Sequence, residues 1–215
     1  MLKIQTIQMN MLEENCYVVF DESKEAVVID CGALQPSDRQ KLTDLINANQ
    51  LKLRHHLCTH MHYDHCFGAA FIKETYGLGP EFNAADMDIY HGMGADLFGP
   101  LRHYMTTDQL PEPAAFLQDG NEIQFGTHTL KVISTPGHSP GSICFYCESE
   151  KVLFAGDTLF YASIGRTDIA GGSFEDLSRS IKDKLFSLPD EVNVYTGHGI
   201  RTQIGFEKQY NPYVH

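Results

Sequence analysis

The sequence predicts an α+β fold in which two β-sheets pack face to face and helices cover their outer surfaces. Two observations support this prediction. A succession of strands, helix, strand and helix occurs twice along the chain, and the apolar side of each such element has to be buried against another layer. No linker or low-complexity segment separates the two halves, so we expect residues 1–215 to form one domain.

The first half is expected to begin with strands, because short runs rich in Val, Ile and Tyr alternate with polar breaks. The predicted strands are Lys3–Met9, Asn15–Phe20, Glu25–Asp30 and Leu53–Cys58. A helix is expected to begin near Pro36, where Ser37 and Gln40 have the spacing of a capping box. Its apolar stripe consists of Leu42, Leu45 and Ile46.

A second helix is expected over Phe67–Tyr76, ending at Gly77. The next segment, Asp86–Phe116, differs in composition, because glycines and prolines are mixed with Met, Phe and Tyr. We expect a helix followed by an irregular excursion. That excursion is either a lid over a functional site or a surface insertion without a role.

Strands resume in the second half and surround one long helix. The predicted strands are Glu122–Phe125, His128–Ser134, Ser142–Cys147, Val152–Phe154 and Val192–Thr196. The helix is expected over Phe174–Ser187, with its leucines and Ile181 on one side.

Charge and hydropathy narrow the classes of partner. The formal net charge is −12 and the pI is about 5.2. Such an acidic protein repels phosphate backbones, so we expect no nucleic-acid partner. No apolar stretch is long enough to span a bilayer, and the first residues alternate like a strand rather than a signal peptide. We therefore expect a cytoplasmic protein that binds no membrane.

The six cysteines are expected to be reduced in a chain of this length without a secretion signal. Cys144 and Cys147 have the CxxC spacing of some metal and redox sites. They lie in a predicted strand, however, where residues three apart point to opposite faces. We interpret them as two buried small apolar residues.

Four side chains that can bind metal lie within six residues, namely His60, His62, Asp64 and His65. Three imidazoles and a carboxylate so close together are difficult to bury unless a cation satisfies them. Further candidate ligands follow predicted strands and have glycine close by, which permits tight turns. They are His138, Asp157 and His198.

The spacing predicts two adjacent cation sites. Residues two apart on an extended segment face the same way, whereas the last two residues of the cluster lie where the chain turns into a helix. One site would use His60, His62 and His138, and the other Asp64, His65 and His198. Asp157 could bridge the two ions. Imidazole and carboxylate together suit zinc, iron or manganese, and two such ions can share a hydroxide of near-neutral pKa.

Asp30 ends a predicted strand and has two interpretations. It either accepts the second N–H of a ligand histidine or simply forms a turn. Six other histidines have no comparable context and are interpreted as ordinary residues. They are His55, His56, His91, His103, His128 and His215.

At these residues the chain resembles the metallo-β-lactamase superfamily. The matching pieces are the motif His60-x-His62-x-Asp64-His65, then His138, Asp157 and His198 in that order. The resemblance spans nearly the whole chain. It implies an αββα sandwich with a two-metal site at one edge of the sheets.

Within that superfamily the chain is most similar to the short bacterial glyoxalase II-like proteins. The segments that carry this similarity are Gly156–Phe160, Ile164–Asp168, Thr196–Gly199 and Phe206–Pro212. Asp157 matches the bridging carboxylate of that group, which β-lactamases of this fold replace with Cys. The resemblance therefore implies hydrolysis of a thioester such as S-lactoylglutathione by a metal-bridging hydroxide, which Asp64 would ligate and orient.

Two departures from the glyoxalase II pattern concern the substrate. Full-length members have a C-terminal helical domain that holds glutathione, and we expect none here. They also often carry Lys and Tyr after the bridging Asp, where this chain has Gly165-Arg-Thr-Asp168. Arg166 keeps the positive charge, so it either binds a substrate carboxylate or forms an ion pair with Asp168.

Two other functions remain open at this stage. Persulfide dioxygenases share the fold and a Gly-Arg-Thr-Asp stretch, and they bind one iron through two His and one Asp. Here those ligands would be His62 or His60, with His138 and Asp157. A non-catalytic metal-binding protein on the same scaffold is the other possibility. RNA-processing relatives add a domain that we do not expect in this acidic chain.

Overall fold

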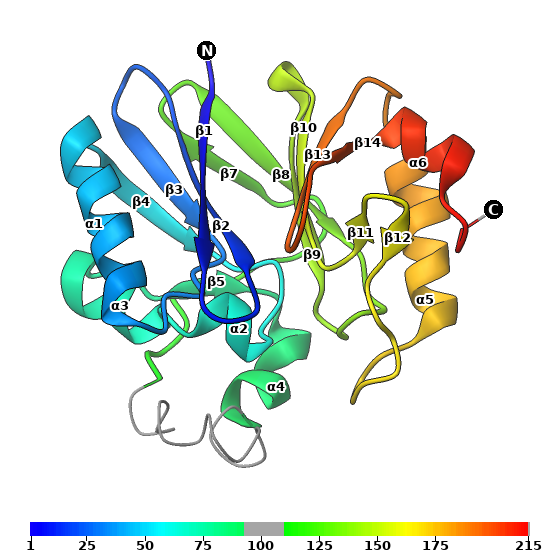
Figure 1. Cartoon of the computed structure of the whole chain (residues 1–215), viewed down its shortest axis with the longest axis horizontal. Coiled ribbons are helices and arrows are strands. Elements are labelled where there is room, and N and C mark those ends of the chain that lie inside the picture. Colours follow the sequence, from blue (N-terminus) through cyan, green and yellow to red (C-terminus); the bar gives the residue numbers. More distant parts are fainter. Residues whose placement is uncertain (93–109, 215) are drawn as a thin grey trace.

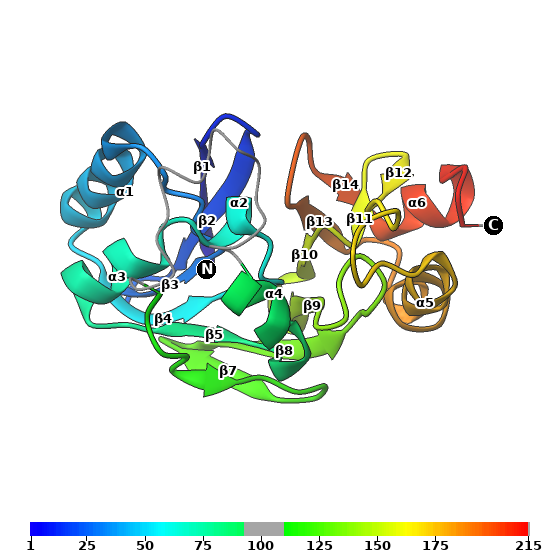
Figure 2. The ribbon, with the colours of Figure 1, turned by 90° about the horizontal axis from the view of Figure 1, so that it is seen from below.

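The computed structural model describes residues 1–92 and 110–214. These residues form two six-stranded sheets that face one another, with helices against the outer surface of each (Figure 1). Seen from below, the layers again follow one another as helix, sheet, sheet and helix (Figure 2). The fold class predicted from the sequence is therefore confirmed.

The first sheet is antiparallel at one edge and parallel across the rest. Its strands in spatial order are β1 (Lys3–Met9), β2 (Glu14–Phe20), β3 (Glu25–Ile29), β4 (Lys52–Leu57), β5 (Pro80–Phe82) and β6 (Ala115–Phe116). The first three pair antiparallel, and β3 to β6 pair parallel.

The second sheet is antiparallel except for one pair of parallel strands. Its strands in spatial order are β14 (Thr202–Gln203), β13 (Asn193–Thr196), β10 (Val152–Gly156), β9 (Ile143–Cys147), β8 (His128–Ser134) and β7 (Glu122–Phe125). A small hairpin of β11 (Leu159–Phe160) and β12 (Ser163–Ile164) follows β10.

Helices α1 (Pro36–Asn49) and α3 (Ala69–Tyr76) flank the first sheet, and α5 (Phe174–Arg179) and α6 (Ile204–Tyr210) flank the second (Figure 1). The short helices α2 (Tyr63–Cys66) and α4 (Met87–Gly92) lie at the lower end of the sandwich in this view. None of the described helices is long and apolar enough to cross a bilayer.

Strand β2 is buried along its whole length because it has a packed layer on each side. Tyr17 and Val19 belong to the core between the two sheets. Val18 and Phe20 point the opposite way and pack with residues of α1 and α3. Because successive side chains point to opposite faces of the strand, β2 contributes to both cores.

The two cysteines of the CxxC stretch lie on opposite faces of β9, as the strand period predicts. Cys147 is part of the core between the sheets, and Cys144 packs with Leu177 and Ile181 under the outer helices. Burial raises the pKa of the Cys144 thiol to about 11. Their interpretation as buried apolar residues is confirmed, and all six cysteines are free and buried.

Strand direction explains why one edge of the sandwich collects the polar residues. Strands β3 and β4 are parallel, and so are β10 and β13. Strand β8 runs the same way as β10, because both are antiparallel to β9. The carboxyl ends of β3 and β4 therefore lie at one edge of the first sheet, and those of β8, β10 and β13 lie at one edge of the second.

The predicted capping pair of the first helix is wrong. The N-cap is Gln35 rather than Ser37, and the residue that reaches back is Asp38 rather than Gln40. The Asp38 carboxylate accepts the N–H of Gln35 at 3.2 Å and also that of Asn10 at 3.2 Å. Asn10, which directly follows β1, is thus a second donor that holds the Asp38 carboxylate at the start of the helix.

One predicted helix is confirmed and another is interrupted. The helix expected over Phe67–Tyr76 is α3, which begins two residues later and ends before Gly77 as predicted. Its N-cap Gly68 donates its N–H to Cys31 O at 2.7 Å and has no room for a side chain, and the short helix α2 before it was not predicted. The helix expected over Phe174–Ser187 continues after α5 as the π turn η5 (Ser180–Lys184) and the 3₁₀ turn η6 (Leu185–Ser187). At its π turn, Ser180 donates a hydrogen bond to Pro136 O at 2.8 Å.

The segment Asp86–Phe116 is described only at its ends. It begins at the 3₁₀ turn η1 (Ala84–Asp86), continues as helix α4 and ends in β6. The excursion predicted between them, with its two interpretations as lid or insertion, lies mainly in residues 93–109, outside the described residues. The sequence patterns also missed strands β5, β6, β11, β12 and β14, a second 3₁₀ turn, η4 (Glu148–Glu150), and helix α6.

Candidate metal centre

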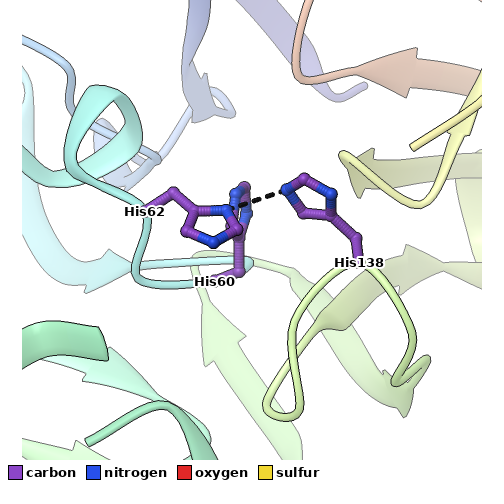
Figure 3. Close-up of side chains that lie close together, drawn as sticks. All are labelled: His60, His62 and His138. Carbon is purple, nitrogen blue, oxygen red and sulfur yellow. Dashed lines mark hydrogen bonds between the residues drawn. The ribbon is translucent and has the colours of Figure 1, made fainter. Parts of the chain in front are cut away.

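Three histidines converge at the edge of the sandwich (Figure 3). His60 and His62 lie on the loop between β4 and α2, and His138 lies on the loop between β8 and β9. Each offers one ring nitrogen, and these atoms all lie within 4.8 Å of one another. His62 Nδ1 is 2.8 Å from His138 Nε2. We call these three residues the first triad.

A second cluster of ligand atoms lies beside the first. Asp64, His65 and His198 also bring one atom each to within 4.8 Å of one another. Asp64 Oδ2 is 3.2 Å from His198 Nε2, and the two Nε2 atoms of His65 and His198 are 3.3 Å apart. We call these residues the second triad. The atoms of each predicted set thus lie close together, and their binding of metal stays a prediction.

Asp157 lies between the triads, directly after β10. Its Oδ2 atom is 3.6 Å from His138 Nε2 in the first triad and 3.8 Å from His198 Nε2 in the second. Its Oδ1 atom is 3.4 Å from His65 Nε2. One carboxylate therefore faces ligand atoms of both clusters.

Unpaired buried atoms test whether a metal fits here. His60 Nε2 and Asp157 Oδ1 are both buried and have no hydrogen-bond partner. Each such atom costs about 1–3 kcal/mol when it is left unsatisfied. A divalent cation would accept both lone pairs, and a set of imidazoles and carboxylates suits zinc, iron or manganese. The residues present therefore fit a metal centre.

Hydrogen bonds on the far side of two rings fix the direction of their Nε2 lone pairs. His138 Nδ1 donates to Arg166 O at 2.8 Å, and His198 Nδ1 donates to Leu12 O at 2.9 Å. Carbonyl oxygens only accept, so the proton must lie on Nδ1. The Nε2 atoms are then free to bind an ion.

Asp30 orients the other two buried rings. Its Oδ2 atom accepts the N–H of His65 Nδ1 at 3.0 Å and the hydroxyl of Thr59 at 2.8 Å. Thr59 Oγ1 in turn lies 3.1 Å from His60 Nδ1. Asp30 also adopts φ +50°, which is a turn conformation. The sequence left a histidine contact and a turn as alternatives for this residue, and the structure shows both.

The charges of the two triads differ. Burial, together with the neighbouring imidazoles, lowers the pKa of His60 well below its ordinary value and that of His62 to about 4. Burial acts the same way on His65, but the carboxylates of Asp157, Asp64 and Asp30 outweigh it and raise its pKa. His60 and His62 of the first triad are thus neutral imidazoles, whereas the second triad combines the carboxylate of Asp64 with His65, whose raised pKa favours the protonated ring.

The Asp157 carboxylate between the two triads is kept charged by its neighbours and is closely packed against the backbone. Burial would raise the pKa of Asp157, but the charge of His65, together with His138 and His198, holds it well below the ordinary value. A side chain at Gly197 would overlap Asp157 Oδ1, so the backbone must approach the carboxylate closely here.

One residue that holds the His198 loop has no motif in the sequence. Asn15, at the start of β2, donates from Nδ2 to Thr196 O and to Gly199 O, both at 3.0 Å. Its N–H also bonds to Gly197 O at 2.8 Å. A polar residue inside an otherwise apolar strand is the signal that could have indicated this role.

Arg166 forms the ion pair that the sequence offered as one alternative. Its Nε and Nη2 atoms contact the two carboxylate oxygens of Asp168 at 2.8 and 3.0 Å. Both side chains are exposed. Binding of a substrate carboxylate by Arg166 stays a prediction.

The histidines interpreted as ordinary lie outside both triads. His55 pairs with Glu81 at 2.8 Å, and His128 lies between Asp21 at 3.1 Å and Glu150 at 2.9 Å. His56 is buried, whereas His91 is exposed. His103 and His215 lie outside the described residues.

Two facing sheets with a histidine and aspartate cluster at one edge define a metal-dependent class of protein. The chain belongs to the metallo-β-lactamase superfamily, whose sequence profile matches residues 10–198. Members of this superfamily are generally hydrolases.

Individual relatives agree with this assignment over nearly the whole chain. An uncharacterized protein of Mycobacterium leprae is 38% identical and covers 95% of this chain and 94% of its own. A hydroxyacylglutathione hydrolase of Haemophilus influenzae is 33% identical and covers 99% of this chain and 98% of its own.

Solved structures show the same arrangement. BLEG-1, described as a B3 metallo-β-lactamase, has a TM-score of 0.84 at 34% identity and covers 100% of this chain and 99% of its own. TTHA1623 in a di-iron-bound form has a TM-score of 0.84 at 33% identity, over 98% of this chain and 100% of its own. ETHE1 from Myxococcus xanthus has a TM-score of 0.78 at 27% identity, over 98% and 83%.

Proposed function

We propose that this protein is a binuclear metal-dependent hydrolase of acyl thioesters, with S-lactoylglutathione or a related thioester as substrate. The observation that carries the proposal is the position of Asp157. Its Oδ2 atom lies 3.6 Å from a ligand atom of the first triad and 3.8 Å from one of the second. A carboxylate shared between two adjacent ions is what a binuclear hydrolytic centre needs.

In this proposal the first triad holds one ion, the second triad holds the other, and Asp157 joins them. Two divalent cations, zinc or else iron or manganese, would supply an acidified water and polarise the substrate carbonyl. Asp64 would help to hold one ion and orient that water. Its Oδ2 atom lies 3.2 Å from His198 Nε2, and its side chain keeps 11% exposure, whereas His65 has none.

The substrate class is supported by the relative from Haemophilus influenzae, which is described as a hydroxyacylglutathione hydrolase. The aspartate at position 157 also supports it, since the resemblance places cysteine there in β-lactamases of this fold. Likeness to a protein described as a B3 metallo-β-lactamase makes a cephalosporin the comparison substrate that the test must include.

The second triad is also what favours hydrolysis over the mononuclear dioxygenase alternative. One iron would need only His62 or His60, with His138 and Asp157. The atoms of Asp64, His65 and His198 would then have no reason to converge. The di-iron-bound relative supports two occupied sites as well.

The test combines metal counting with a substrate panel. Protein produced with zinc, iron or manganese would be assayed by elemental analysis, and thiol release would be followed with S-lactoylglutathione and coenzyme A thioesters. All six cysteines are buried, so the background thiol signal is low. We expect two ions per chain and thioester hydrolysis that exceeds cephalosporin hydrolysis. Chelation should remove the ions and the thioester hydrolysis together.

Two other results would contradict the proposal. One iron per chain with oxygen uptake on glutathione persulfide would identify a dioxygenase. Two ions without hydrolysis of any thioester, ester or lactone would identify a metal-binding protein without this activity.

A further inference from the structure

Asp86 is a buried carboxylate that neither the sequence motifs nor the proposed reaction uses. It ends the 3₁₀ turn η1, and its residue has 0% exposure. It lies directly behind two loops of the metal centre, the one between β4 and α2 and the one between β8 and β9.

The carboxylate bonds to both loops. Its Oδ2 atom accepts the N–H of Met61 at 3.0 Å and the hydroxyl of Ser139 at 2.8 Å. Its Oδ1 atom accepts the N–H of Gly141 at 2.6 Å. Met61 lies between His60 and His62 in the sequence, and Ser139 directly follows His138.

These three bonds are charge-assisted and buried, so they are stronger than ordinary hydrogen bonds. The Asp86 carboxylate also packs closely against the backbone of Gly141, where an added Cβ atom would lie 2.7 Å from Asp86 Cγ. Nearer the strand ends, the same loops are joined by the Ile143 N–H to Thr59 O bond at 2.8 Å. Asp86 is the link that lies next to the ligand residues themselves.

We infer that Asp86 is a positioning residue that sets the distance between the His60–His62 loop and the His138 loop, and so the affinity of the first triad for its ion. The inference rests on the metal centre of the proposed function. No contact joins the Asp86 carboxylate to the described residues of the second triad, so loss of Asp86 weakens the first site selectively.

The matched control is Asp21. This carboxylate is also buried and accepts the N–H of Ser23 at 2.9 Å and of Thr127 at 2.8 Å, as well as both hydroxyls. Its partners lie away from both triads. Asp21→Asn therefore measures the cost of removing a buried, backbone-bonded carboxylate without touching the metal loops.

The experiment titrates metal-free protein with Co²⁺ and follows the ligand-field absorption, with the folded state checked by circular dichroism. We expect the wild type and Asp21→Asn to bind two ions. Asp86→Asn should bind one ion normally and the other about 10–100-fold more weakly. In a His198→Ala background, which keeps the first triad, adding Asp86→Asn should weaken binding at the first site by the same factor of about 10–100.

Two further measurements keep the inference open to refutation. If Asp86→Asn does not fold, Ser139→Ala removes one donor and keeps the carboxylate, and the first ion should then bind several-fold more weakly at nearly unchanged stability. Wild-type Co²⁺ affinity and spectrum at both sites in the folded variants would show that Asp86 serves only the fold. Because the readout is metal binding, a protein that binds two ions but hydrolyses no thioester would refute the proposed function and leave this inference standing.

Discussion

Asp30 Oδ2 lies 3.0 Å from Nδ1 of His65, on the side of the ring opposite the atom that faces Asp157. The same oxygen accepts the hydroxyl of Thr59, and Oδ1 accepts the Thr59 N–H at 2.7 Å. Three donors thus point at one carboxylate, and the direction of a proposed ligand depends on it.

Asp30→Asn should lower metal affinity and hydrolytic activity about 10–100-fold. The amide group of Asn would turn its NH₂ towards at least one of the three donors, so the His65 ring would lose its fixed orientation. Metal titration and kcat/KM measure the effect. Asp168→Asn, which changes an exposed carboxylate near the same edge, is the control and should keep wild-type metal loading. Equal values in both variants would refute the role of Asp30.

Asp157→Ala should remove both the loading of two ions and the activity. Its carboxylate faces ligand atoms of both triads, and no other described side chain does so through two oxygens. Elemental analysis after dialysis gives the number of ions per chain. Two ions retained by this variant would show that Asp157 does not bridge them.

Gly197→Ala should reduce activity at least tenfold although it adds only a methyl group. The new Cβ atom would overlap Asp157 Oδ1 and lie 2.8 Å from His65 Cε1. Displacement of a reacting group by about 1 Å is enough for a loss on the order of 100-fold. Gly92→Ala in α4, where a Cβ would lie more than 4 Å from every described residue outside that helix, is the control and should leave kcat/KM unchanged. A fully active Gly197→Ala variant would mean that the close approach has no functional role.

His56 should make the metal-free protein sensitive to acid. Burial lowers its pKa to about 4, against about 6.5 in the unfolded chain. Its stabilising contribution is therefore complete above pH 6.5 and decreases as the pH falls towards 4. Between pH 6.5 and 5.0 the loss amounts to about 2 kcal/mol.

The measurement is urea unfolding of the metal-free wild type and His56→Leu at both pH values. The wild type should lose about 2 kcal/mol more than the variant. The exposed His91→Leu should lose as much as the wild type. Parallel losses in all three proteins would refute the assignment to His56.

The longer strands and the ligand residues were predictable because both depend on a few consecutive residues. A run rich in Val and Tyr identifies β2, and a spacing of two places His60 and His62 on one side of an extended loop. The ends of parallel strands then bring distant loops to one edge. These are properties that a few consecutive residues encode.

Other features could not be predicted, because they depend on partners distant in the sequence. Asp38 replaces Gln40 at the helix start since Asn10, in the turn after β1, also donates a hydrogen bond to it. Helix α6 contains a buried Glu207, and one of the hydrogen bonds that satisfy this carboxylate comes from the distant Ala162 N–H, at 3.0 Å. Asp86 has backbone donors as its main partners, and backbone groups leave no motif in a sequence.

The proposed ligands are divided between the two sheets. The cluster from His60 to His65 follows β4 of the first sheet, whereas His138, Asp157 and His198 follow strands of the second. Ions held there would link the two sheets, and they would bind only after both sheets have assembled. Binding energy would then become folding energy, about 4 kcal/mol at a free metal concentration 1,000 times Kd. The melting temperature should accordingly rise with free metal concentration and fall on chelation, so the state of the centre can be followed without any substrate.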